Sequence, residues 1–499
     1  MFETKRANLL DECVWAPSPE PGLLGYIEIW WAADQNNDVL LESENYHYRQ
    51  GFLADNEVDD WLHQKRQFGR PQYTSSSPES VLTGRLSCIR LLMCERLTRK
   101  FYPPVFAMSR ESFERVETAF GLPRATLPLL CRNSGMEYYS LGFAPQGHSN
   151  TTESLPTVSV VIKYPQMFQL GNLGFAMTHS LSTGNTLAFL HGWSIFRNQN
   201  AVTKKETTPH SERIHSLLQP SVTLWKHPLL LPTLLFQEHL FRCDEFIWRS
   251  LSSQTQAIEF ELGMSRTGRL ANTEHAVLEE IVNLLSDDSR RLLITSDVNT
   301  ALTDAITFAS VLKWDQRLGE FIKRLDKELR KYYEGANIGL ATVKELESAV
   351  DHFSCEAVST AEYAGSIRSR LEVQLSVLYN FVAQAGNDLN SRIAATTGLD
   401  SSAMKTLALV TAVFLPPAYV ASLFSMSMFD WQASDDGSSG HGVVSNRFWI
   451  YWVVSAPLTA AILAGWRFWW KSQKVHYAKE YPKVLSVGVK DEGGEAKEV

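Results

Sequence analysis

Cysteine is scarce in this chain, and the six cysteines that occur form no metal-binding pattern. They are scattered without a C-x-x-C pair, at Cys13, Cys88, Cys94, Cys131, Cys243 and Cys355. This spacing fits a reducing compartment and gives no sign of a structural zinc site. The sequence also contains no P-loop, G-x-G-x-x-G, H-E-x-x-H or G-x-S-x-G segment. His210 and His215 are interpreted as surface residues, and no motif supports an enzyme.

Strong charge bias and an N-terminal targeting segment are also missing. The formal net charge is −8 over 499 residues, which argues against nucleic acid as a general partner. The N-terminus, MFETKRANLLDECVW, lacks the apolar core of a signal peptide, and its acidic residues argue against a transit peptide. Because the first apolar span comes after residue 400, we expect the long N-terminal part to lie in the cytoplasm.

One stretch lacks charge altogether. From Thr406 to Phe429 there is no Asp, Glu, Lys, Arg or His, and about 20 apolar residues suffice for a helix to cross the roughly 30 Å hydrocarbon core of a bilayer. A second apolar run, Phe448 to Trp470, carries tryptophans at both ends, as segments with membrane-interface belts do. The alternative is a buried hairpin in a soluble protein, which leaves two separate tryptophan belts unexplained.

Charges outside the two runs predict their orientation. Lysines stand at position 405 and again after position 470, whereas the linker between the runs carries Asp430, Asp435 and Asp436. By the positive-inside rule, both termini are cytoplasmic and the short acidic linker lies outside. We therefore expect a multi-pass membrane protein with two spans, in the plasma membrane rather than an organelle.

Small and polar residues follow one face of the first span and of the segment before it. Alternating steps of four and three residues trace one face of a supercoiled helix. From Ala383 they reach Asn387, Asn390, Ala394, Thr397, Ser401, Met404, Ala408, Thr411, Leu415, Ala418, Ser422 and Ser425. In a membrane such residues turn toward neighbouring helices or a water-filled path. Tight helix packing without a path and a pore-lining stripe both fit this pattern.

The rest of the chain predicts an α+β fold. Strand-like segments at 25–32, 157–164 and 186–193 suit the sheet of an α/β domain, and a helix capped by Ser109 ends at Gly121. Amphipathic helices follow from about Pro232, and apolar residues from Leu371 to Leu389 suit a coiled-coil seam. The expected division is a cytoplasmic α/β domain over 1–230, a long-helix stalk over 231–403, a first transmembrane helix over 404–428, an outer loop over 429–446, a second transmembrane helix over 447–470 and a cytoplasmic tail over 471–499.

These features resemble a known superfamily. A long helix running into MKTLALVTAVFLP, then LFSM, a short outer loop, a second span and a basic tail is similar to the CorA divalent-cation transporters. The segments DSSAMKT, FLP and LFSM resemble the CorA-like group of filamentous fungi. The close match covers about residues 370–470, and the remainder matches in general layout. The resemblance implies a homopentamer whose first spans line a central pore, with a cytoplasmic funnel that responds to Mg²⁺.

The resemblance also implies which residues face the pore. The superfamily's Gly-Met-Asn triplet corresponds here to Ser425-Met426-Ser427, so the methionine is kept and the glycine and asparagine are not. Further pore-facing positions implied by the resemblance are Ser422, Ala418, Leu415, Thr411, Met404 and Asn390.

Two aspartates near the first span allow different interpretations. A ring of Asp430 would attract cations at the outer mouth, although an ordinary solvated loop carboxylate is equally compatible with the sequence. Asp400, just before the span, either helps in cation attraction or caps local structure.

The leading hypothesis is a transporter or channel for divalent cations, with Mg²⁺ as the expected cargo. No cofactor is expected beyond the divalent cation itself, as transported ion and candidate regulator, and no metal ligand is assigned. The changed triplet leaves a second hypothesis open, a membrane-anchored sensor or scaffold that keeps the fold without conducting.

Overall fold

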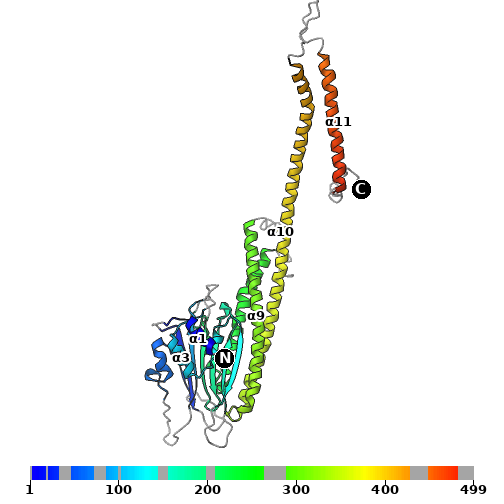
Figure 1. The fold of residues 1–499 in the computed structure, drawn as a ribbon. Coiled ribbons are helices and arrows are strands. Elements are labelled where there is room, and N and C mark those ends of the chain that lie inside the picture. Colours follow the sequence, from blue (N-terminus) through cyan, green and yellow to red (C-terminus); the bar gives the residue numbers. More distant parts are fainter. Residues whose placement is uncertain are drawn as a thin grey trace, which may run out of the picture. The chain divides into compact units, whose positions relative to one another are not determined.

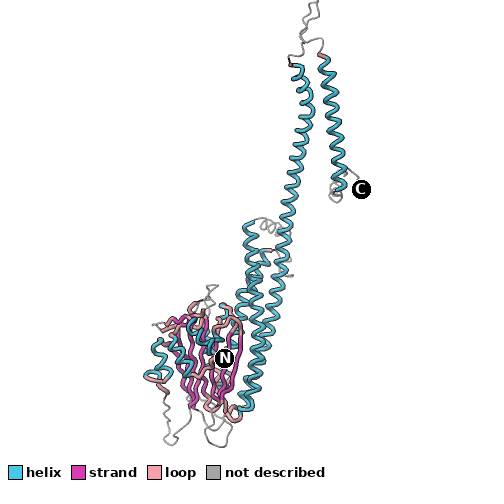
Figure 2. Tube along the Cα trace, viewed as in Figure 1, coloured by secondary structure: helices cyan, strands magenta, loops and turns pink. Residues whose placement is uncertain are grey.

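The computed structural model describes residues 3–17, 21–32, 46–71, 86–98, 103–143, 155–197, 208–262, 288–426 and 448–480. The chain divides into two compact units, Met1–Phe381 and Val382–Val499. In the first unit, short helices and strands precede long helices, which gives the mixed α+β class predicted from the sequence (Figure 2). The finer domain boundaries stay predictions.

Among the described residues, seven strands form the main sheet, in the order β3-β2-β4-β9-β8-β7-β6. Neighbouring strands are antiparallel except for the parallel pair β4 and β9. The strands are β2 (Leu24–Ala32), β3 (Tyr46–Phe52), β4 (Leu86–Glu95), β6 (Met136–Gly142), β7 (Thr157–Lys163), β8 (Gly174–Ser180) and β9 (Asn185–Gly192). A second, two-stranded sheet pairs β1 (Val14–Trp15) with β5 (Val105–Phe106). The segments predicted as strands at 25–32, 157–164 and 186–193 are thus confirmed.

Helices cover both faces of the main sheet, with α1 (Glu3–Glu12) and α3 (Arg110–Ala119) on one side (Figure 1). The short helices α2 (Val58–Leu62) and α4 (Thr126–Leu130) add to the same apolar cluster. As predicted, Ser109 caps α3, since its side chain accepts a hydrogen bond from the Ser112 amide. Strand β4 is buried along almost its whole length, as expected for a strand in the middle of a sheet with two covered faces.

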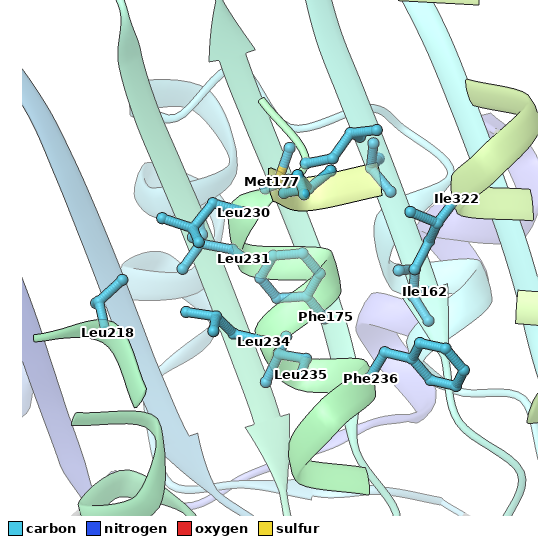
Figure 3. Packing of buried hydrophobic residues seen from close by; sticks show 14 of the residues in the cluster. Ile162, Phe175, Met177, Leu218, Leu230, Leu231, Leu234, Leu235, Phe236 and Ile322 are labelled. Atoms are coloured by element: carbon cyan, nitrogen blue, oxygen red, sulfur yellow. The ribbon is translucent and has the colours of Figure 1, made fainter. Parts of the chain in front are cut away.

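The other face of the sheet packs against α5 (His210–Leu218), α6 (Leu230–Phe246) and α9 (Asp288–Tyr333). Figure 3 shows Leu231, Leu235 and Phe236 of α6 lying over Ile162 and Phe175 of the sheet. A π-helical segment, Ile247–Ser252, joins α6 to α7 (Ser253–Glu261). The apolar contacts between the sheet and these helices hold α6 and α9 against the sheet.

Long helices extend from this domain. Helix α10 (Leu340–Phe424) continues for 85 residues, so the expected uninterrupted helix leading into the first apolar run is present. Ion pairs join α9 to α10 at Lys323–Asp351, 2.7 Å, and at Arg330–Glu347, 2.9 Å. Of the predicted seam, Leu371 and Leu378 are buried in a cluster with residues of α9, whereas Leu389 is exposed. Helix α11 (Trp449–Glu480) closes the described chain.

The interpretation of His210 as a surface residue is wrong. Its side chain is 1% exposed, and its Nδ1 lies 2.9 Å from a carboxylate oxygen of Glu238, which also pairs with Arg213 and Arg242. The loose sequence spacing of His210 and His215 could not reveal this pairing, because Glu238 follows on a separate helix. His215 is partly exposed and lies edge-on to Tyr48.

Buried neutral histidines predict that acid destabilises this domain. Burial lowers the pKa of His179 to about 3, and His179 Nδ1 lies 2.8 Å from the Thr186 hydroxyl. Because an unfolded histidine titrates near pH 6.5, the unfolded state binds the extra proton between about pH 6.5 and pH 3. The free energy of unfolding therefore falls as the pH drops through this window, by at most about 1.4 kcal/mol per pH unit for each such histidine. His227, with a pKa lowered to about 3 by burial, adds to this slope.

Glu95 opposes the effect, because burial raises its pKa to about 7 and so favours the folded state as the pH falls from 7 toward 4.5. The specific expectation is that His179→Gln flattens the pH dependence of urea unfolding below pH 6.5. The control His47→Gln changes an exposed histidine on β3 and should leave the slope unaltered. Equal slopes for wild type and His179→Gln would contradict a neutral buried His179.

Candidate functional site

Two helices of the second unit are long and apolar enough to cross a membrane. They cover Ala403–Phe424 and Trp449–Lys471, 22 and 23 residues, which at 1.5 Å per residue reach about 33–35 Å. Only 11% and 6% of their most apolar windows are buried inside the chain, whereas the core helix of a soluble protein is mostly buried. Their surroundings must therefore come from a bilayer, from other copies of the chain, or from both.

The two helices meet along a narrow seam. Val420 of α10 and Ser455 of α11 are 2% and 1% exposed, and Pro416 is buried as well. The Tyr451 hydroxyl donates a hydrogen bond to the Pro417 carbonyl oxygen at 3.2 Å. The double proline thus lies on the side of α10 that α11 covers.

The predicted small and polar stripe lies on the opposite side of α10. At about 100° per residue, Thr411, Ala418 and Ser422 fall within roughly 20° of the direction opposite Val420. All three side chains are exposed. Contact with α11 therefore leaves the stripe uncovered.

The exposed stripe offers acceptor oxygens. Thr411 donates its hydroxyl proton to the Leu407 carbonyl oxygen at 2.8 Å, so the lone pairs of the Thr411 oxygen remain available as acceptors. Between Thr406 and Phe424 no side chain carries a charge. Lys405 comes just before this segment, with its ammonium 5.6 Å from the centre of the Trp470 ring. The stripe therefore suits a hydrated cation better than a bare one, since hydroxyls can accept hydrogen bonds from the water shell.

The remaining predicted residues are placed as follows. Leu415 and Met404 are exposed apolar side chains of α10, and Asn390 is exposed farther along the same helix. Ser425 and Met426 end the described helix, where the Ser425 amide bonds to the Ala421 carbonyl and the Met426 amide to that of Leu423. Ser427 and Asp430 lie outside the described residues, and Asp400 is part of the backbone of α10.

Among the described residues, one cluster of metal-ligating side chains was not predicted from the sequence. Three fully buried residues, His239, Cys243 and Asp315, bring their ligand atoms within 4.8 Å of one another. The four-residue spacing of His239 and Cys243 on a helix was the available signal. Asp315, which comes 72 residues after Cys243, could be added only once α6 and α9 were placed together.

Comparisons with known proteins add partial matches. No family model matches the chain. The "Notoamide biosynthesis cluster protein M'" of Aspergillus versicolor is 32% identical over 134 residues, which are 26% of this chain and 27% of that relative. The match thus spans about a quarter of the curated relative.

Three solved structures are similar in fold. The full-length CmaX protein matches at 11% identity and a TM-score of 0.35, over 90% of this chain and 98% of its own. The CorA magnesium transporter from Methanocaldococcus jannaschii matches at 14% identity and a TM-score of 0.30, over 80% of this chain and 94% of its own. The ZntB cytoplasmic domain from Vibrio parahaemolyticus RIMD 2210633 matches at 10% identity and a TM-score of 0.26, over 60% of this chain and 88% of its own.

Because all three TM-scores are below 0.5, the functional proposal takes its support from the residues of this chain.

Proposed function

We propose that this protein is a membrane transporter or channel for divalent metal cations, with Mg²⁺ as the expected cargo. The observation that carries the proposal is the position of the stripe, which lies opposite the face of α10 that α11 covers. If α11 faces lipid, the stripe of the same chain turns inward. Small and polar groups then avoid the acyl chains, as the energetics of polar groups in membranes require.

Several copies must build such a path, because two helices cannot enclose one. With copies of α10 around a common axis, each exposed stripe would contribute one side of the wall. The resemblance to CorA suggests five copies. Oligomerisation would also cover the apolar residues that flank the stripe, among them Phe414 and Tyr419, both exposed in the single chain.

The chemistry of the stripe suits a hydrated divalent ion. Mg²⁺ gives up its water reluctantly and prefers octahedral oxygen coordination, so hydroxyl rings at Thr411, Ser422 and Ser425 would bind the water shell rather than the ion. Rings of Leu415 and Met404 would form apolar constrictions that close by dewetting. The triplet Ser425-Met426-Ser427 would form the outer mouth, with Asp430 nearby attracting cations.

A second candidate follows from the same triplet. Replacement of Gly-Met-Asn by Ser-Met-Ser removes the amide side chain at the outer mouth, and a chain that lost conduction would serve as a membrane-anchored sensor or scaffold. Its function would survive exchange of both spans for unrelated membrane anchors. A transporter would lose its function in that exchange.

The deciding experiment uses the full-length chain, purified in detergent and reconstituted into vesicles with a Mg²⁺-sensitive dye inside. We expect Mg²⁺ entry driven by an inside-negative potential, and a mass of several copies per particle by light scattering. Monomeric particles, or vesicles that pass no divalent cation, would refute transport. Retained cellular function after exchange of the spans would then favour the anchored sensor.

A further inference from the structure

Helices α6 and α9, both in the first unit, bring three metal-ligating side chains together. His239 and Cys243 lie one turn apart on α6, and Asp315 lies on α9. The Nε2 of His239 is 3.0 Å from Oδ1 of Asp315, and the Cys243 sulfur is 3.7 Å from that Nε2 and 3.7 Å from Oδ2 of Asp315. His239, Cys243 and Asp315 are all 0% exposed.

These separations match the edges of a metal tetrahedron. Zinc bonds of about 2.0–2.1 Å to nitrogen or oxygen and about 2.3 Å to sulfur, at tetrahedral angles, place the ligand atoms about 3.3–3.6 Å apart. Two edges, Nε2 of His239 to Oδ1 of Asp315 at 3.0 Å and Nε2 to the Cys243 sulfur at 3.7 Å, differ from those values by a few tenths of an ångström. The third edge, from the sulfur to the carboxylate, is at most 4.8 Å. Little movement of α6 or α9 is therefore needed to close the three side chains on one ion.

Unpartnered polar atoms at the same place point to a missing ligand. Oδ1 of Asp315 lies 3.0 Å from Nε2 of His239, yet it has no hydrogen bond of acceptable geometry. The buried hydroxyl of Tyr164, whose ring lies 4.8 Å from the His239 ring, also has none. Buried polar groups are nearly always satisfied, and several unsatisfied ones together call for an ion or a water.

We propose that His239, Cys243 and Asp315 bind a thiophilic divalent metal ion, with Zn²⁺ as the reference ion, at a site that joins α6 to α9. A thiolate and a carboxylate balance the charge of the ion, so the occupied site is neutral in its buried surroundings. The fourth position is left to a water molecule or to the Tyr164 hydroxyl. Sulfur is a poor ligand for Mg²⁺, which distinguishes this site from the proposed cargo.

The first test is the metal content of wild type, purified as the full-length chain in detergent. Mass spectrometry should find one Zn²⁺ per chain after growth with zinc, and replacement by Co²⁺ should give visible d–d bands with a thiolate-to-cobalt charge-transfer band. Wild type that holds no stoichiometric metal and gives no cobalt–thiolate band would overturn the proposal. In that case the three residues form a buried hydrogen-bonding group only.

Variants then assign the ligands. Cys243→Ser should weaken metal binding by at least about tenfold. Removing a residue that only hydrogen-bonds to a metal ligand already weakens binding by about that factor, and Cys243 is proposed as a ligand itself. Its matched control is Cys94→Ser, which changes another cysteine with 0% exposure, on β4 and away from α6, and should keep the metal. Equal loss in both would contradict the assignment, and Asp315→Asn provides a second ligand variant if Cys243→Ser fails to fold. Because the site does not depend on the pore, a variant that blocks cation flux should still hold the metal.

Discussion

Ala418→Phe is expected to reduce divalent-cation flux in reconstituted vesicles by at least about tenfold, a barrier increase of about 1.4 kcal/mol. Ala418 is exposed on the face of α10 opposite the seam with α11. If copies of this face surround the path, a phenyl ring from each copy would fill its centre. The initial rate of Mg²⁺ entry at equal protein density measures the effect.

The second apolar helix offers a matched control for this substitution. Ala464 is exposed on α11 and follows Ser455 by nine residues, which at about 100° per residue is opposite the seam. Ala464→Phe therefore adds the same ring to the surface that the proposal assigns to lipid. We expect near wild-type flux from this variant, with both variants keeping the wild-type particle mass.

The reverse outcome would change the interpretation of the two helices. A flux defect in Ala464→Phe with a normal Ala418→Phe would place α11 toward the axis. Normal flux in both variants would mean that α10 does not line the ion path. In either case the stripe would be assigned to helix packing, the alternative that the sequence analysis left open.

Local sequence signals predicted much of the fold. Ser109, Gly121 and Pro123 define the ends of α3, and alternation indicates β2, because both signals act over a few residues. Strand β4 is harder to predict from the sequence, since burial on both faces removes the alternation that separates a strand from a helix. A long helix leading into the first apolar run was predicted, because the stretch before that run has helical spacing and few helix-breaking residues.

The sequence predicted the functional helix only in part. The stripe from Thr411 to Ser425 was visible as a periodic pattern, but its relation to α11 was not, because the seam depends on side chains about 35 residues apart. The His239–Cys243–Asp315 cluster likewise needs α6 and α9 side by side. The predicted mouth residues Ser427 and Asp430 lie outside the described residues, so their roles stay proposals.

The largest expected loss of stability comes from a buried ion pair that joins strands β3, β2 and β4 of the main sheet. Glu28 on β2 is 0% exposed and stands directly opposite Arg49 of β3 and Arg90 of β4 in the strand register. Its carboxylate accepts from Nε of Arg49 at 2.9 Å and from Nε of Arg90 at 2.8 Å. The sheet thus buries an acid between two bases that its register holds in place.

Arg90 also ties the α2 segment to the sheet. It donates to the carbonyl oxygens of Trp61 and Leu62, and its guanidinium lies 4.2 Å from the centre of the Trp61 ring. Arg90→Met therefore removes one of the two arginines that pair with Glu28. It also leaves the carbonyl oxygens of Trp61 and Leu62 without their hydrogen-bond donor. Breaking a buried pair in this way costs about 3–5 kcal/mol, and we expect urea unfolding of the first unit to show a loss of that size.

Two further variants separate charge burial from simple loss of a contact. Arg115→Met removes an arginine whose exposed side chain pairs loosely with Asp59 at 3.7 Å, and it should cost at most about 1 kcal/mol. The double variant Glu28→Gln with Arg90→Met removes the unpaired charge and should recover part of the loss. If the double variant is as unstable as Arg90→Met alone, the unfolding free energy depends on the carbonyl contacts of Arg90 rather than on the buried acid.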